Sequence, residues 1–156
     1  MKKIVAIFMT IFSVNLFALS FSVAPTEFNI SLDKNQLYEA YIMNNTFSPL
    51  RIEIYKEDIK GYEDKSITED IIVFPKIVSI RPGGKQLVRF KVKPNPERKK
   101  GVYKSLLVFR ENPNNIKTVS KSTKDGFETK LNFITEIAIG VRGEKKWKKF
   151  YQYYFY

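Results

Sequence analysis

The chain has 156 residues, with 27 Lys and Arg against 16 Asp and Glu, and it contains no Cys and no His. These two absences exclude a disulfide framework, Cys or His nucleophiles, a Ser-His-Asp triad and any metal site built on Cys or His. The formal net charge of +11 favours anionic lipid, cell-wall polymer or an acidic protein as a partner over nucleic acid, although basic residues that serve solubility are an equally good interpretation. The sequence points to no cofactor and to no enzymatic site.

The first 20 residues have the form of a secretory signal peptide. Residues 1–3 are short and basic, residues 4–17 are mostly apolar, and Ala18 and Ser20 are the small residues of a cleavage site before Phe21. The alternative is an uncleaved membrane anchor, but the apolar run is shorter than the ~20 residues that a spanning helix needs. We therefore expect a periplasmic protein, exported by a cleaved signal peptide, whose mature chain begins at Phe21.

From Phe21 onward the sequence is typical of strands and turns. Pro25 interrupts the first apolar segment, which indicates an edge strand or a strand that changes partners. Residues 56–70 are charged and predict a loop with one short helical turn, and residues 111–126 are a long polar connection with no packing signal. The segments with strand character are residues 21–32, 36–44, 50–55, 71–80, 85–92, 103–110 and 127–141. This spacing predicts an all-β protein, an immunoglobulin-like seven-stranded antiparallel β-sandwich.

Three stretches are specific in combination: "FSVAPTEFNISL" (21–32), "FPKIVSIRPGGKQLVRFKV" (74–92) and "YKSLLVFRENP" (103–113). In the second, Pro82 fixes φ near −65° and the following glycines can take positive φ, so the turn between two strands is rigid. Together these stretches resemble the amino-terminal, immunoglobulin-like domain of periplasmic pilus chaperones over roughly residues 21–142. The expected organisation is a signal peptide (1–20), one chaperone-type domain (21–143) and a basic aromatic tail (144–156).

The resemblance implies that the last core strand is lent to an incomplete subunit by strand addition. Phe127, Thr129, Leu131 and Phe133 share one face of this segment, and we expect them to be the partner-binding residues, with burial in the chain's own sandwich as the alternative. Beyond them, the alternate residues at 137–141 are expected to enter the domain's own core. The implied partners are pilin-like or surface-fibre subunits and an outer-membrane usher.

Two basic residues that hold the subunit's terminal carboxylate in that family are absent here. Their positions fall on Glu27 and Ala138, and a carboxylate at the first would repel the subunit's carboxylate. Arg142 matches the family's terminal Arg and is the candidate basic contact, whereas its usual acidic partner falls on Lys104. We therefore expect a single-domain relative of these chaperones, whose fold follows from the resemblance and whose mechanism has to be argued from its own residues.

The tail, "EKKWKKFYQYYFY" (144–156), combines lysines with aromatic residues. It has three interpretations: it extends the last strand or pairs with an edge of its own sandwich, it contacts an anionic membrane surface, or it is offered to a partner. These leave open a second function, an envelope adaptor or structural protein that uses the same sandwich and is anchored by its tail.

Overall fold

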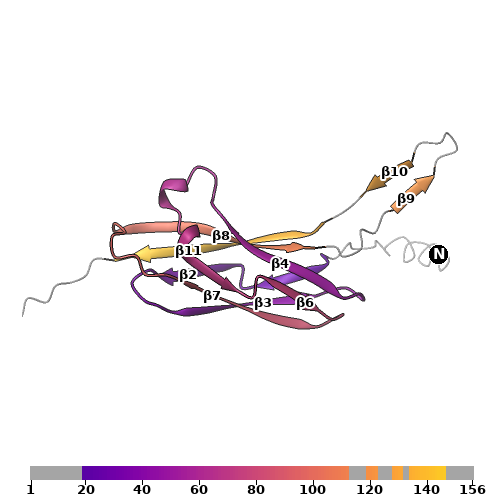
Figure 1. Cartoon of the computed structure of the whole chain (residues 1–156), viewed down its shortest axis with the longest axis horizontal. Coiled ribbons are helices and arrows are strands. Elements are labelled where there is room, and N and C mark those ends of the chain that lie inside the picture. The colour runs from indigo at the N-terminus through magenta and orange to yellow at the C-terminus, as the bar shows by residue number, and fades with distance from the viewer. Residues whose placement is uncertain (1–18, 113–118, 123–127, 132–133, 147–156) are drawn as a thin grey trace, which may run out of the picture.

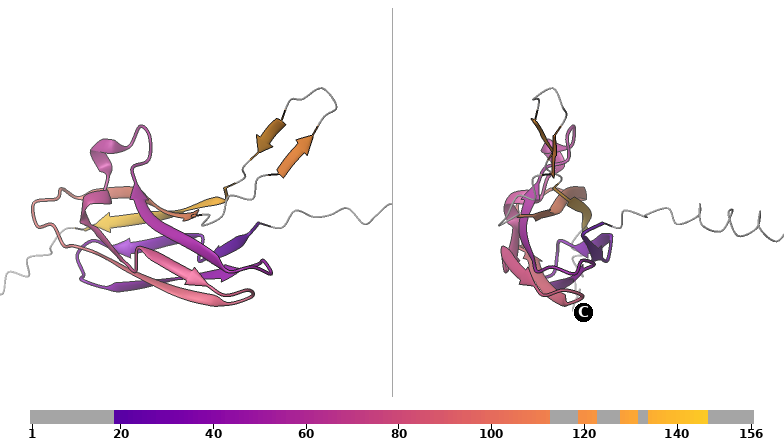
Figure 2. Two further views of the ribbon diagram at one scale, coloured as in Figure 1. Left: turned by 45° about the vertical axis from the view of Figure 1, so that its right-hand side comes forward. Right: turned by 90° about the vertical axis from the view of Figure 1, so that its right-hand side faces the viewer.

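The computed structural model describes residues 19–112, 119–122, 128–131 and 134–146. Two sheets face each other across one core, as both views in Figure 2 show. No helix among these residues is long and apolar enough to cross a membrane. The strands, labelled in Figure 1, are β1 (Phe21–Ala24), β2 (Glu27–Ser31), β3 (Leu37–Asn44), β4 (Leu50–Glu57), β5 (Ile71–Phe74), β6 (Ile77–Ile80), β7 (Lys85–Val92), β8 (Gly101–Glu111), β9 (Val119–Ser122), β10 (Glu128–Leu131) and β11 (Glu136–Lys145), and two short 3-10 helices are η1 (Glu63–Lys65) and η2 (Thr68–Asp70).

The four-stranded sheet has the order β1-β3-β7-β5, and the five-stranded sheet has the order β2-β11-β8-β4-β6. This arrangement confirms the predicted immunoglobulin-like sandwich. Two of the seven predicted segments divide between the sheets, each at a cis proline peptide, Ala24-Pro25 and Phe74-Pro75. Both expectations for the segment that holds Pro25 are therefore confirmed, because β1 and β2 lie in opposite sheets and each is an edge strand of its sheet.

Four predictions differ from the structure. The sandwich is not antiparallel throughout, because β2 and β11 run parallel over the register Gly140↔Glu27 to Glu144↔Ser31. The predicted strand 127–141 consists of two strands, β10 and β11, that pair with different neighbours. The connection 111–126 contains β9, and the loop after β4 contains two short helices instead of one. Pairing of this kind joins distant segments, so local periodicity does not report it.

The core is built by alternation along the strands, which sends every second side chain inward. In its centre Phe90 packs edge-on to Phe28, with ring centroids 4.8 Å apart, and stacks with Tyr38 at 5.4 Å. Ile139 and Val141 are each 1% exposed and Ile137 packs against the same cluster, which confirms that residues 137–141 enter the domain's own core.

A buried polar group organises one end of the sandwich. Gly83 takes a φ of 63° in the predicted Pro-Gly turn, and the Gly84 amide donates to the Arg81 carbonyl at 2.9 Å. Asn44, which is fully buried, binds the turn: its main-chain amide donates to the Gly84 carbonyl at 3.0 Å and its side-chain amide donates to the Ile80 carbonyl at 3.0 Å. The turn is thus tied to the end of β3 across the two sheets.

Candidate partner-binding edge

The five-stranded sheet ends in an edge that is only half covered. β2 covers β11 from Gly140 to Glu144, whereas β8 pairs with β11 along its whole length. Residues 136–139 of β11 therefore have β8 on one side and, among the residues that the structure describes, no strand on the other. The reason is the crossing of the first segment at Pro25, because β1 belongs to the opposite sheet and only β2 reaches this edge. Unpaired main-chain groups on such an edge can receive a strand from another chain.

The side chains of this open edge are held firmly by the chain's own sheet. Ile137 and Ile139 turn into the core, while Glu136 turns outward and accepts a hydrogen bond from the Tyr55 hydroxyl at 2.9 Å. Burial, followed by the bond to Glu136, raises the pKa of Tyr55 above its usual value. Arg110 lies 3.7 Å from the same carboxylate. A partner strand would thus meet a backbone that is already fixed in the extended conformation.

The predicted partner-binding residues lie just before this edge. Thr129 and Leu131 belong to β10, which pairs with β9 so that they face Lys121 and Val119 in register. Figure 1 shows the β9–β10 ribbon standing off the end of the sandwich. Phe127 and Phe133 lie outside the described residues. The predicted role of the four residues in partner binding stays a prediction, and sequence reasoning missed the open edge beside them.

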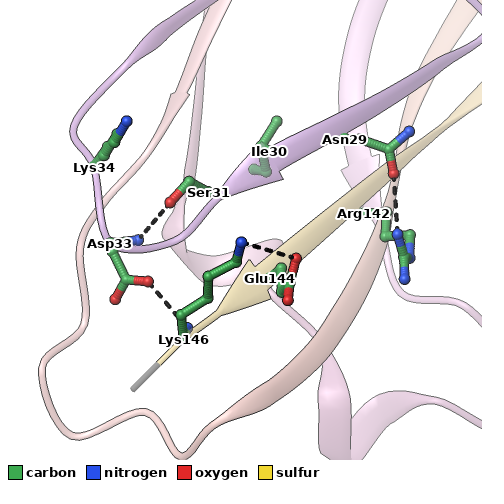
Figure 3. Close-up of a pocket in the computed structure, with 8 residues that line it drawn as sticks. All are labelled: Asn29, Ile30, Ser31, Asp33, Lys34, Arg142, Glu144 and Lys146. Carbon is green, nitrogen blue, oxygen red and sulfur yellow. Dashed lines mark hydrogen bonds and ion pairs between the residues drawn. The ribbon is translucent and has the colours of Figure 1, made fainter. Parts of the chain in front are cut away.

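Arg142 lies farther along β11 in a shallow groove between β11 and β2 (Figure 3). Its guanidinium donates to the Asn29 side-chain oxygen at 3.3 Å, and its register partner on β8 is Lys104. The register thus pairs two basic residues at the positions to which the resemblance assigns an ion pair. The groove is lined by Asn29, Ile30, Ser31, Asp33, Lys34, Arg142, Glu144 and Lys146.

The two positions that lack the family's basic residues come together where the open edge ends. Glu27 is the first residue of β2 and pairs with Gly140, two residues after Ala138. A Cβ built on Gly140 would lie 3.6 Å from the Glu27 Cγ, so the Glu27 side chain shares the outer face with Ala138 and Arg142. The two positions to which the resemblance assigns basic residues thus carry a carboxylate and a methyl group.

Other site chemistry is sparse. Within the described part of the chain, no three Asp and Glu side chains gather closely enough to hold a metal ion.

The first residues of the tail belong to the sandwich. Glu144 and Lys145 are part of β11, and the Lys145 Nζ lies 3.1 Å from an Asp33 carboxylate oxygen. Residues 147–156 lie outside the described residues, as do residues 1–18 of the predicted signal peptide, so both predictions stay open.

No family model matches the chain, and no curated protein matches it. Solved structures do match it. The periplasmic chaperone SfaE is 13% identical with a TM-score of 0.59, over 81% of this chain and 58% of that chain. The chain has the fold of the periplasmic pilus chaperones. It spans little more than half the length of the chaperone structures it matches.

Two further matches are chaperones that were solved in complexes. The structure of the Salmonella enterica SafB chaperone with SafA pilin is 12% identical, with a TM-score of 0.58, over 82% of this chain and 55% of that chain. The Acinetobacter baumannii CsuC–CsuE complex of a chaperone and a tip adhesion subunit is 17% identical, with a TM-score of 0.57, over 81% and 57%. At these identities the likeness shows the shared fold, and function has to be argued from the site.

Proposed function

We propose that this chain is an exported, non-enzymatic, chaperone-like protein that binds pilin-like or surface-fibre subunits by β-strand addition. The observation that carries the proposal is the open edge at residues 136–139, which directly follows the predicted partner-binding segment. In strand addition, main-chain hydrogen bonds supply affinity and alternate side chains supply register. The edge offers the first, and Phe127, Thr129, Leu131 and Phe133 offer the second.

The partner class is inferred from two supports. The edge is the open end of an extended strand, so it suits a partner that lacks a strand of its own. The SafB and CsuC structures, which share the fold, were solved in complexes with a pilin and a tip adhesion subunit. A periplasmic location, export by the signal peptide and delivery to an outer-membrane usher belong to the same proposal.

The proposed mechanism differs from that of the family in one respect. Glu27 and Ala138 cannot anchor a terminal carboxylate through charge-assisted hydrogen bonds. Affinity must then come from the main chain of the edge and from the apolar side chains of the preceding segment. We therefore expect subunit binding to depend weakly on salt, because no charge pair is needed to hold the partner.

The test is affinity capture of subunits from the protein's own envelope extract, followed by mass spectrometry. The variant Leu131→Glu with Phe133→Glu places charges on the predicted binding face and should lose the captured subunit. Lys130→Gln with Asn132→Glu is the control matched in net charge, because the alternating pattern puts these residues on the opposite face of the same segment. Equal capture by the two variants would refute the assignment of the binding face.

Hydrogen exchange then tests the mode of binding. When the captured subunit is added back, the amides of residues 136–139 that face the open edge should become protected, since each would donate to the added strand. Protection confined to other parts of the molecule would show binding without strand addition. That result would reject strand addition as the mode of binding without contradicting the capture of the subunit.

A further inference from the structure

The outer surface of the four-stranded sheet combines exposed apolar side chains with basic ones. Because successive residues of a strand point to opposite faces, the neighbours of buried core residues on β3, β5 and β7 point outward. Leu37 is 55% exposed, Met43 48% and Phe74 76%. The register arranges this surface, which we call the basic-apolar face, in four rungs: Leu37–Lys91–Ile72, Glu39–Arg89–Phe74, Ala24–Tyr41–Leu87 and Ser22–Met43–Lys85.

The charges of this face leave an excess of cations. Glu39 is the only acidic residue in the four rungs, and its carboxylate binds the Arg89 Nε at 2.9 Å. The hydrogen bond from Arg89 holds the pKa of Glu39 below its usual value, so the pair stays charged and balanced. Lys85 and Lys91 carry the remaining positive charge at the two ends of β7. Lys85 also stands 4.0 Å from the centre of the Tyr41 ring.

The composition of the face distinguishes between its potential occupants. A second copy of the chain, packed face to face, would bring together two surfaces that both carry an excess of positive charge, and like charges repel across such an interface. An extended peptide needs a strand edge, whereas β3 and β7 are central strands whose main-chain groups are already paired. Lysines interleaved with exposed apolar and aromatic side chains are the composition of surfaces that lie on anionic bilayers.

We propose that the basic-apolar face binds the surface of an anionic phospholipid bilayer. Lys85 and Lys91 would contact headgroup phosphates, while Phe74 and Met43 would enter the boundary between headgroups and acyl chains. The chain's net charge of +11 acts in the same direction over a longer range. This site is separate from the half-covered edge of the other sheet, so the inference does not rest on the proposed function.

The experiment is sedimentation with vesicles of phosphatidylglycerol and phosphatidylcholine, and with vesicles of phosphatidylcholine alone. The protein is purified from its own cells with the N-terminus that it has there. Each lysine near an anionic surface strengthens binding about fivefold, so Lys85→Gln with Lys91→Gln should bind the anionic vesicles about 25-fold more weakly. Phe74→Ser should also weaken binding, and its side chain is exposed enough for the fold to survive.

Lys60→Gln with Lys104→Gln is the matched control. It removes the same charge from a loop and from β8 of the opposite sheet. The inference predicts near wild-type binding for this control. Equal losses in both double variants would show an effect of overall charge and overturn it, as would equal binding to the two kinds of vesicle. Equally tight binding to soluble polyglutamate, lost in the same variants, would assign the face to an acidic polymer or protein and also overturn it.

Discussion

The buried amide of Asn44 yields the sharpest prediction for stability. Its side-chain nitrogen lies 2.8 Å from the Ser48 carbonyl oxygen, 3.0 Å from that of Ile80 and 3.2 Å from that of Arg81. Its side-chain oxygen accepts from the amide and the hydroxyl of Thr46, both at 2.8 Å. The substitution Asn44→Asp keeps the accepting oxygen and the shape, but it turns the donating nitrogen into an oxygen that faces three carbonyls.

The expected loss of stability follows from the number of bonds. The amide has two protons, so about two hydrogen bonds disappear, at roughly 1 kcal/mol each. The carbonyls left without a donor, together with a buried carboxylate, cost about as much again. The free energy of unfolding should therefore fall by about 4 kcal/mol, a large part of the 5–15 kcal/mol of a typical domain. With a urea dependence of about 2 kcal/mol per M, the midpoint of unfolding should fall by about 2 M.

Urea unfolding followed by circular dichroism measures this effect, and Asn45→Asp is the control because its side chain is exposed on the next residue. Burial should raise the pKa of the introduced carboxyl in the folded state above the unfolded value of about 3.9. The loss caused by Asn44→Asp should therefore be smaller below about pH 4 and grow as the pH rises through the folded pKa. Equal midpoints for the two variants at neutral pH would refute the account of the buried amide.

Two further predictions concern the sandwich and its loop. Gly143→Val should destabilise the fold strongly, since even a Cβ there would lie 2.6 Å from the Leu32 Cδ2. Gly140→Ala is the control and should be tolerated, because its Cβ would make ordinary contacts. Equal urea midpoints of unfolding for the two variants would contradict this prediction. The hydrogen bond from Ser66, followed by that from Thr68, lowers the pKa of Asp58, so Ser66→Ala should raise that pKa in an NMR titration. The stability that depends on the lowered pKa is present above the unfolded pKa and lost as the pH falls through the folded one, so the variant's deficit should narrow in acid; a deficit independent of pH would reject the link.

One more prediction separates the two functions that the sequence left open. Removal of the aromatic part of the tail should abolish retention in the cell envelope if the protein is an adaptor anchored by its tail, and should leave subunit capture intact if the strand-addition mechanism is correct. Fractionation of cells that express each form measures the first outcome, and the capture assay measures the second. If removal of the tail abolished both subunit capture and envelope retention, the result would count against the proposed function.

Much of the fold was predictable from local pattern. In residues 37–44 and 85–92 the alternation marks Ala40, Ile42, Val88 and Phe90 as the inward residues, and all four are buried. Alternation reports the buried face because the side-chain period of a strand is two, whatever the strand pairs with. Pro25 marked the change of sheet for a similarly local reason, since proline cannot continue a central ladder.

The candidate site was only partly predictable. The sequence correctly predicted that residues 137–141 enter the core, and the partner-binding role of the residues before them stays a prediction. It did not reveal that β2 covers only the second half of β11, and therefore did not reveal the open edge at residues 136–139. Nor did it reveal that Lys85, Lys91 and the exposed apolar residues of three strands share one face in register.

The difference between the features that the sequence predicted and those that it did not has one physical cause. By itself, the sequence determined which residues avoid water, where the chain turns and which chemistries are absent, because these depend on each residue and its near neighbours. Only the tertiary structure decided which strands lie side by side. Nearly every residue has the same main-chain N–H donor and C=O acceptor, so these groups do not specify which strand they pair with. The parallel pairing of β2 with β11, the open edge and the basic-apolar face all follow from that choice.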